Sequence, residues 1–235
     1  MMKALNIHWL LCVLLAVVST AHTQSVVTAD VRLRLAFPQQ NVHPSPPAVL
    51  WLKPVQQASA LPIAPAGQFK LLQRNRMFTP HLLVIPVGSE VLFPNADPFF
   101  HNVFSLFDGK RFDLGLYEAG STKRVTFSRE GISYIFCNIH PEMSAVVVAL
   151  STRFYAIADA KSSFEVRNVP AGDYDLHVWI EGVPQAALKE LERRIHITAG
   201  TNDLGQLDIK TMQQRPAEHL NKFGRPYDRE EKQSY

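Results

Sequence analysis

The sequence predicts an all-β protein made of many short strands. Beyond residue 25 the apolar side chains recur mostly at every second position, which is the period of a strand with one buried face. The chain holds 16 prolines among its 235 residues, and together with glycines they interrupt this pattern repeatedly. A hydrophobic share of 46% and a length sufficient for one large or two small domains indicate a globular protein. The formal charge of +3 is too small to suggest a nucleic-acid partner.

The N-terminal residues 1–21 are typical of a secretory signal peptide. Lys3 precedes the apolar run WLLCVLLAVV at 9–18, and Ala21 offers a small residue for cleavage. A membrane-spanning helix needs roughly 20 apolar residues, so this run is too short to be one. We therefore expect an exported, soluble, periplasmic protein with no transmembrane segment in its mature chain.

Two segments and then a longer series are expected to form strands before residue 151. VRLRLAF at 31–37 and AVLWL at 48–52 are separated by a region that contains prolines. Further segments follow at the spacing of a sandwich or barrel. They are FKLLQRNR, HLLVIPV, EVLFPN, HNVFSL, KRVTFS, ISYIFC and AVVVAL, between 69 and 150.

A second group of strands is expected after Ser151. FYAIAD and FEVRNV come first, followed by the turn PAG and then by DYDLHVWI, whose alternation predicts a half-buried strand. PQAALKELERR at 184–194 is a candidate short helix that begins at Pro184. From 212 to 235 the chain is polar and of mixed charge, which predicts a flexible tail.

Removal of the signal peptide leaves Cys137 without another cysteine in the chain. Exported proteins usually pair their cysteines, so an unpaired one indicates an intermolecular partner, a reactive role or a metal. In CNIHPEM at 137–143 it is followed by His140 and Met143. Soft sulfur suits Cu(I) and imidazole also accommodates Cu(II), so these residue types indicate an electron-transfer copper site. His101, which lies between two expected strands, is the natural candidate for the remaining ligand.

FPNADPFFHNVFS at 93–105, followed by YIFCNIHPEM at 134–143, resembles the cupredoxins, the small blue copper proteins that include plastocyanin and amicyanin. The resemblance covers about 66–150 and implies a Greek-key β-sandwich there. It also implies one type 1 copper ion with four ligands, which in this chain are His101, Cys137, His140 and Met143. By the same resemblance, Asn102 ties the two ligand loops together by hydrogen bonding close to the Cys137 sulfur.

The phrases FPN, HNVFS, FDLGLY and CNIH are similar to those of a narrower group, exported plastocyanin-like proteins often labelled methylamine-utilisation proteins. Those proteins also carry a module similar to the carboxypeptidase-regulatory, or transthyretin-like, sandwich. AVLWLKP at 48–54 and FEVRNVPAGDYDLHVW at 164–179 resemble that module. The resemblance therefore implies a second small sandwich built from 26–56 and 151–211, with the copper domain at 66–150 inserted into it. Two tandem domains are the alternative.

The resemblance implies electron transfer, with electrons leaving through His140 and a partner docking on His140, Pro141, Phe99 and Phe100. A c-type cytochrome or a periplasmic dehydrogenase would suit this surface. There are two alternatives: a copper-handling protein that uses the same ligands only to bind and hand over the ion, and a structural β-sandwich module without a redox role. Zinc also binds Cys and His, but a thioether is a poor zinc ligand.

Several residues also have ordinary structural explanations. Met143, directly before AVVVAL, could fill the core. Three aspartates near the site are expected to form turns rather than to act as acids or bases: Asp97, Asp108 and Asp113. No catalytic triad or paired-carboxylate motif stands out, so we do not expect an enzyme. We expect five further histidines to be structural or solvated: His43, His81, His177, His196 and His219.

Overall fold

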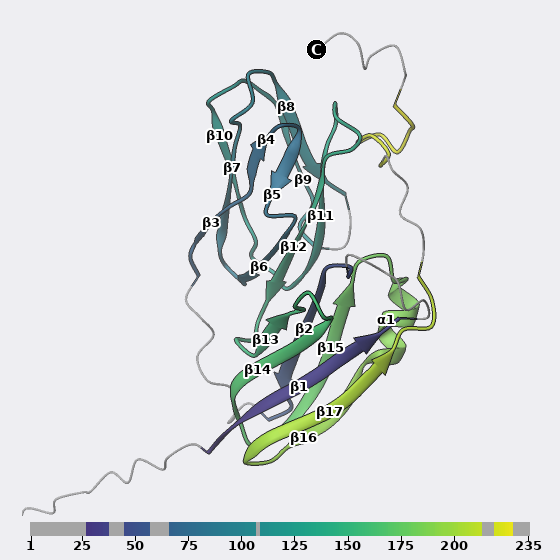
Figure 1. The fold of residues 1–235 in the computed structure, drawn as a ribbon. Helices are drawn as coiled ribbons and strands as arrows, with labels where there is room; N and C mark the ends of the chain where they lie inside the picture. Colours follow the sequence, from purple (N-terminus) through teal and green to yellow (C-terminus); the bar gives the residue numbers. More distant parts are fainter. Residues whose placement is uncertain (1–26, 38–44, 57–65, 107–108, 213–218, 228–235) are drawn as a thin grey trace, which may run out of the picture.

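The computed structural model describes residues 27–37, 45–56, 66–106, 109–212 and 219–227 (Figure 1). The expected signal peptide at 1–21 lies outside them, as do His43 and Asp108. The regular secondary structure of these residues consists of strands and one short helix, and this confirms the predicted all-β fold class. No helix among them is long and apolar enough to cross a membrane.

The described strands fall into an upper and a lower unit in Figure 1. The upper unit contains β3 (Gln68–Lys70), β4 (Leu72–Arg74), β5 (Met77–Thr79), β6 (Leu82–Pro86), β7 (Glu90–Pro94), β8 (His101–Ser105), β9 (Phe112–Tyr117), β10 (Thr122–Thr126), β11 (Gly131–Cys137) and β12 (Ser144–Leu150). The lower unit contains β1 (Thr28–Ala36), β2 (Ala48–Pro54), β13 (Tyr155–Ile157), β14 (Ser163–Pro170), β15 (Gly172–Ile180), α1 (Gln185–Leu191), β16 (Arg193–Ile197) and β17 (Gly200–Asp208).

The lower unit is assembled from strands that precede and strands that follow the upper unit. β1 lies between β14 and β17 in one sheet, and β2 lies between β13 and β15 in the other, which ends with β16. The chain therefore leaves the lower unit after β2 and returns to it at β13. The division into a copper domain at 66–150 and a second sandwich built from 26–56 and 151–211 stays a prediction.

Two sheets of the upper unit enclose a buried core, and this core includes candidate metal ligands. The five-stranded sheet has the order β6-β12-β11-β8-β9 and the three-stranded sheet the order β10-β7-β3. Phe93 and Val125 from the smaller sheet share a buried cluster with Ile135 and Val147 from the larger sheet. Side chains on alternate positions of the larger sheet therefore face this core.

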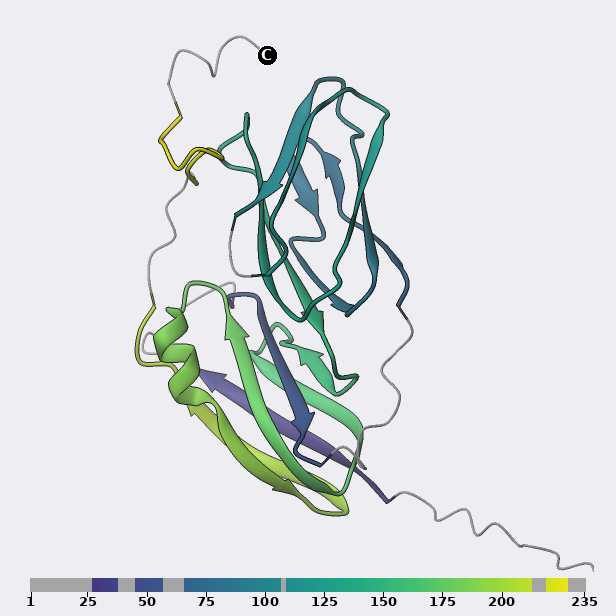
Figure 2. The same cartoon turned by 180° about the vertical axis from the view of Figure 1, so that it is seen from behind.

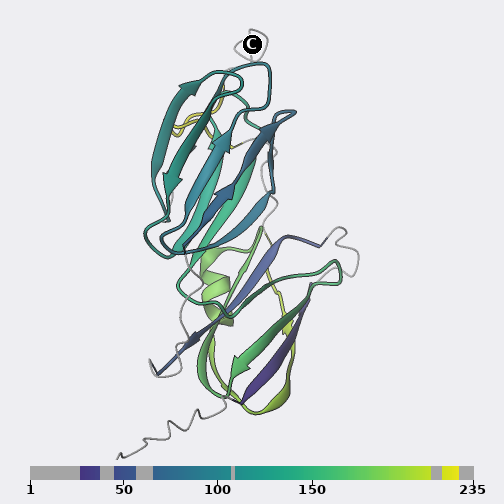
Figure 3. The same ribbon diagram turned by 90° about the vertical axis from the view of Figure 1, so that its left-hand side faces the viewer.

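Strand β12 is buried on both faces. One face of the larger sheet covers the upper core, and the other face packs against the lower unit. Val147 belongs to the upper core, whereas Val146 and Val148 belong to the core of the lower unit. Figure 3 shows the upper unit standing on the lower one. Polar contacts reinforce this packing: His81 bridges the Ser144 carbonyl at 3.1 Å and the Glu181 carboxylate at 2.9 Å.

Two predicted elements can be compared directly with the structure. The helix expected at 184–194 is present as α1, and it ends earlier because β16 begins at Arg193. The flexible tail expected at 212–235 includes residues 219–227, which lie beside the upper unit in both Figure 1 and Figure 2. The polar composition suggested a solvated chain, but these residues make hydrogen bonds and ring contacts that their own sequence does not reveal.

Candidate metal centre

Strand pairing brings the predicted ligands to one end of the five-stranded sheet. Cys137 is the last residue of β11 and His101 the first residue of β8, and these strands are antiparallel neighbours. The end of one strand therefore meets the start of the other. His140 and Met143 follow on the short loop that connects β11 to β12.

Three donor atoms face one another at this end of the sheet. The Cys137 Sγ atom lies 3.5 Å from the Nδ1 atoms of both His101 and His140, and the two Nδ1 atoms are 3.1 Å apart. The side chains are buried, with exposed fractions of 0%, 0% and 6% for Cys137, His101 and His140. A point equidistant from the three atoms lies about 2 Å from each, close to the bond length of a first-row metal to nitrogen. The sulfur and two imidazoles are thus arranged as a trigonal ligand set.

The protonation of the three side chains depends on this burial. Burial raises the pKa of the Cys137 thiol. Hydrogen bonds from the backbone N–H groups of Ile139, Asn102 and His140 lower it, but by less, so the pKa stays above its ordinary value. Burial lowers the pKa of His101, and burial together with the nearby His101 lowers the pKa of His140 to about 4. Neutral imidazoles are the metal-binding form, and a bound cation favours the thiolate.

Met143 is buried beside these ligands, with an exposed fraction of 1%. Its backbone N–H donates to the His140 carbonyl at 3.0 Å and its carbonyl accepts from the Cys137 N–H at 3.3 Å, which closes the loop. Its side chain belongs to the same apolar cluster as Cys137. This position fits both a core residue and a weak axial ligand, so the ligand role stays a prediction.

Asn102 ties the two ligand loops together through its backbone. Its carbonyl accepts a hydrogen bond from the Asn138 N–H at 2.8 Å, and its own N–H is one of those that lower the pKa of Cys137. Its side chain instead donates to the Asp113 carboxylate at 2.6 Å. This backbone hydrogen bond does not depend on the side chain, so the link between the two loops does not require an asparagine at position 102.

Asp97 contacts a candidate ligand, and sequence reasoning assigned it only to a turn. Its Oδ2 atom lies 3.0 Å from the Nε2 atom of His101, and its exposed fraction is 4%. Burial raises the pKa of Asp97, but the N–H groups of Arg76 and Asn75 and the His101 side chain together lower it below its usual value. A carboxylate four residues before the His was the only signal in the sequence.

The predicted docking residues differ in their exposure and in their contact with the two imidazoles. The Phe99 ring lies 5.4 Å from His101 and 5.3 Å from His140, measured between ring centroids. Phe100 is 47% exposed, whereas Pro141 is buried like His140. The Arg76 guanidinium lies over the outer side of this group, 5.3 Å from the Phe99 centroid.

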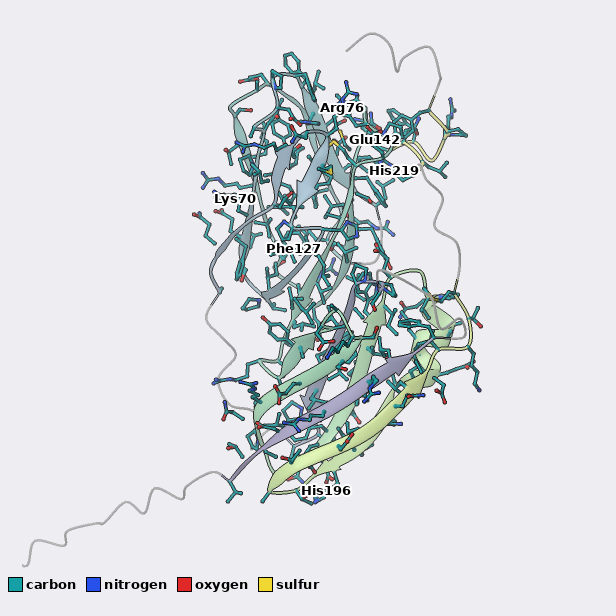
Figure 4. The ribbon with its side chains drawn as sticks, in the orientation of Figure 1. Lys70, Arg76, Phe127, Glu142, His196 and His219 are labelled. Atoms are coloured by element: carbon teal, nitrogen blue, oxygen red, sulfur yellow. The ribbon has the colours of Figure 1, made fainter. Side chains whose placement is uncertain are left out.

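Residues 219–227, which we call the C-terminal segment, lie against the ligand loop. The His219 N–H donates to the Pro141 carbonyl at 3.1 Å, the Lys222 N–H to the Asn138 side chain at 2.9 Å, and the Tyr227 hydroxyl to the Cys137 carbonyl at 2.9 Å. Figure 4 shows His219, Glu142 and Arg76 at the same end of the upper unit. The aromatic residues within this polar stretch were the only signal that it packs.

Neither a family model nor a curated protein matches the chain. Among solved structures, a purple cupredoxin from Nitrosopumilus maritimus is 26% identical over 36% of this chain and 99% of its own, with a TM-score of 0.32. The copper-containing nitrite reductase NirK from Thermus scotoductus is 25% identical over 42% of this chain and 27% of its own, with a TM-score of 0.34. A reduced amicyanin mutant is 21% identical over 35% of this chain and 82% of its own, with a TM-score of 0.33. At these TM-scores the likenesses establish no family, and the chemistry of the site must be judged from its own residues.

Proposed function

We propose that this chain is an electron-transfer protein with one mononuclear type 1 copper ion held by His101, Cys137 and His140, with Met143 as the axial ligand. The observation that carries this proposal is the triangle of one buried sulfur and two Nδ1 atoms, with sides of 3.1 to 3.5 Å. Copper would supply the one-electron couple. A trigonal Cys and two His with a distant thioether are the ligands typical of blue-copper sites.

The protein's contribution would be to keep these ligands still. Two of them lie on paired strands, and backbone hydrogen bonds from Asn138 and Met143 fix the loop that carries the third. Phe99 packs on both imidazoles and limits their rotation. A ligand set that does not move between oxidation states lowers the reorganisation needed for each electron.

We place the docking surface at the end of the upper unit that carries His140, Pro141, Phe99 and Phe100. Phe100 supplies its exposed apolar area, and a small patch of this kind suits brief, weak association. A c-type cytochrome or a periplasmic dehydrogenase is the kind of partner we propose. Export to the periplasm, the absence of catalysis and membership of the methylamine-utilisation group are parts of the same proposal.

Burial of the ligands favours electron transfer over copper handling. A protein that hands over copper needs an incoming ligand to reach the ion, whereas the three donor side chains here are at most 6% exposed. An electron can cross a layer of packed side chains that an ion cannot. Slow exchange of bound copper with a Cu(I) chelator would agree with the proposal, and rapid exchange would support copper handling instead.

The visible and electron-paramagnetic-resonance spectra of the chain without residues 1–21, after addition of Cu(II), test the proposal. We expect an intense blue thiolate-to-copper band that bleaches on reduction, returns on oxidation and disappears in Cys137→Ser. His196→Gln is the matched control, because this exposed histidine lies at the far end of the lower unit (Figure 4). A colourless protein with ordinary Cu(II) signals would overturn the proposal.

A further inference from the structure

Asp97 connects the first candidate ligand to a hairpin that carries no ligand. Its Oδ1 atom accepts the Asn75 N–H at 2.5 Å, and its Oδ2 atom accepts the Arg76 N–H at 3.1 Å and lies 3.0 Å from His101 Nε2. Two backbone N–H groups and one imidazole nitrogen therefore converge on one carboxylate that is 4% exposed. A buried carboxylate requires such compensation, because an unpaired charge in the interior is costly.

The two backbone donors belong to an unusual turn. Asn75 and Arg76 connect β4 to β5, and both have left-handed backbone conformations, with φ of 55° and 54°. Two consecutive residues with positive φ form the tight turn that suits a two-residue hairpin, but non-glycine residues adopt it at some cost. Bonds from both N–H groups to Asp97 offset that cost and attach the turn to the loop between β7 and β8, which precedes His101.

The loop around Asp97 is held on its other side as well. The Asp97 N–H donates to the Asn95 side chain at 3.0 Å, and the Asn95 amide donates to the Phe99 carbonyl at 2.7 Å. Asn95 is itself 1% exposed. The carboxylate thus has a fixed position relative to β8, which begins with His101.

We propose that Asp97 is the positioning residue of the metal centre: it accepts a hydrogen bond from the Nε2–H group of His101 and thereby turns the Nδ1 lone pair toward Cys137 and His140. This inference rests on the proposed copper site and adds a residue to it. A carboxylate bonded to the distal nitrogen of a ligating imidazole fixes its tautomer and orientation and increases its basicity. The added negative charge stabilises Cu(II) more than Cu(I).

An asparagine cannot replace this carboxylate without losing a contact. Its amide has the size of the carboxylate but only one acceptor oxygen, whereas two backbone N–H groups and the proposed Nε2–H group of His101 all require acceptors at this position. Asp97→Asn therefore must either release the turn or present an N–H to His101. In the second case Nδ1 becomes the protonated nitrogen and can no longer bind a metal.

The first measurement is the tautomer of His101 in the copper-free wild-type chain, by nitrogen-15 NMR of the imidazoles. We expect the proton on Nε2 and the lone pair on Nδ1, and a proton on Nδ1 would overturn the inference. This measurement needs neither copper nor a variant, so it remains valid if the copper proposal fails or if Asp97→Asn does not fold.

The second measurement compares copper affinity and reduction potential in Asp97→Asn and Asp159→Asn. Asp159 is the matched control, because its carboxylate also accepts two backbone N–H groups of a turn, those of Lys161 at 2.8 Å and Ser163 at 2.9 Å, but lies in the lower unit between β13 and β14. We expect Asp97→Asn to bind Cu(II) about 10 to 100 times more weakly and to have a higher reduction potential, with little change in Asp159→Asn. Equal affinity and potential in Asp97→Asn and the wild type would show that Asp97 serves the turn alone.

Discussion

The hydroxyl of Tyr227 gives a sensitive test of whether the C-terminal segment holds the ligand loop. Tyr227→Phe removes one hydrogen bond, 2.9 Å long, to the carbonyl of Cys137 and leaves the ring that packs 5.5 Å from His219. A partly buried hydrogen bond of this kind contributes about 1 kcal/mol net. The ratio of docked to undocked segment should therefore fall roughly fivefold.

Hydrogen exchange of the copper-free protein measures this ratio at two amides that bond to the loop. The N–H groups of His219 and Lys222 donate to Pro141 and Asn138, so both exchange only when the segment leaves. We expect each to exchange about five times faster in Tyr227→Phe. Tyr155→Phe, at an exposed tyrosine of β13 in the lower unit, is the matched control. Unprotected amides in the wild type, or unchanged exchange in the variant, would refute docking of the segment on the loop.

Two further predictions concern the stability of the whole chain. Val148→Ala on β12 removes two buried methyl groups from the lower core, so we expect a loss of about 2 kcal/mol and a melting temperature lower by roughly 4 to 8 °C. Trp51 and Trp179 both lie in the lower unit, and an unchanged melting curve of their fluorescence would contradict the shared core. In the copper-free protein the pKa of His140 is lowered to about 4, so below pH about 6.5 the unfolded chain binds a proton that the folded chain does not. As the pH falls from about 6.5 to about 4, the free energy of unfolding should then decrease by up to about 1.4 kcal/mol per pH unit. Urea titrations that give a constant free energy of unfolding over this range would disprove the lowered pKa of His140.

The parts of the site that the sequence could predict are those encoded by local spacing. Cys137 and His140 are three residues apart on one loop, and His101 begins the strand next to the one that Cys137 ends. Alternation of apolar residues likewise indicated most strands. Such patterns depend only on neighbours in the chain or on a single strand pairing.

The remaining parts depend on contacts between distant residues, which no local pattern encodes. The sequence around Asp97 indicates only a turn. Its contact with His101 is found only in the structure, which brings the Asn75–Arg76 turn and His101 to its carboxylate. The polar composition of residues 219–227 indicates a solvated tail. The sequence does not reveal their partners in the ligand loop, because these lie some eighty residues earlier. In both cases the residue types have several ordinary uses, and only the tertiary structure decides among them.

The pairing of β2 with β13 has a consequence for how the molecule responds to damage. The Trp51 and Tyr155 positions are directly opposite each other, although the whole upper unit, residues 68–150, lies between them in the chain. A folded upper unit holds the end of β2 close to the start of β13, whereas an unfolded upper unit becomes a long loop whose closure costs entropy. A substitution at a candidate metal ligand that unfolds the upper unit would therefore weaken a sheet that contains none of these ligands, and a metal ion that stabilises the upper unit would protect residues of the lower unit from proteolysis.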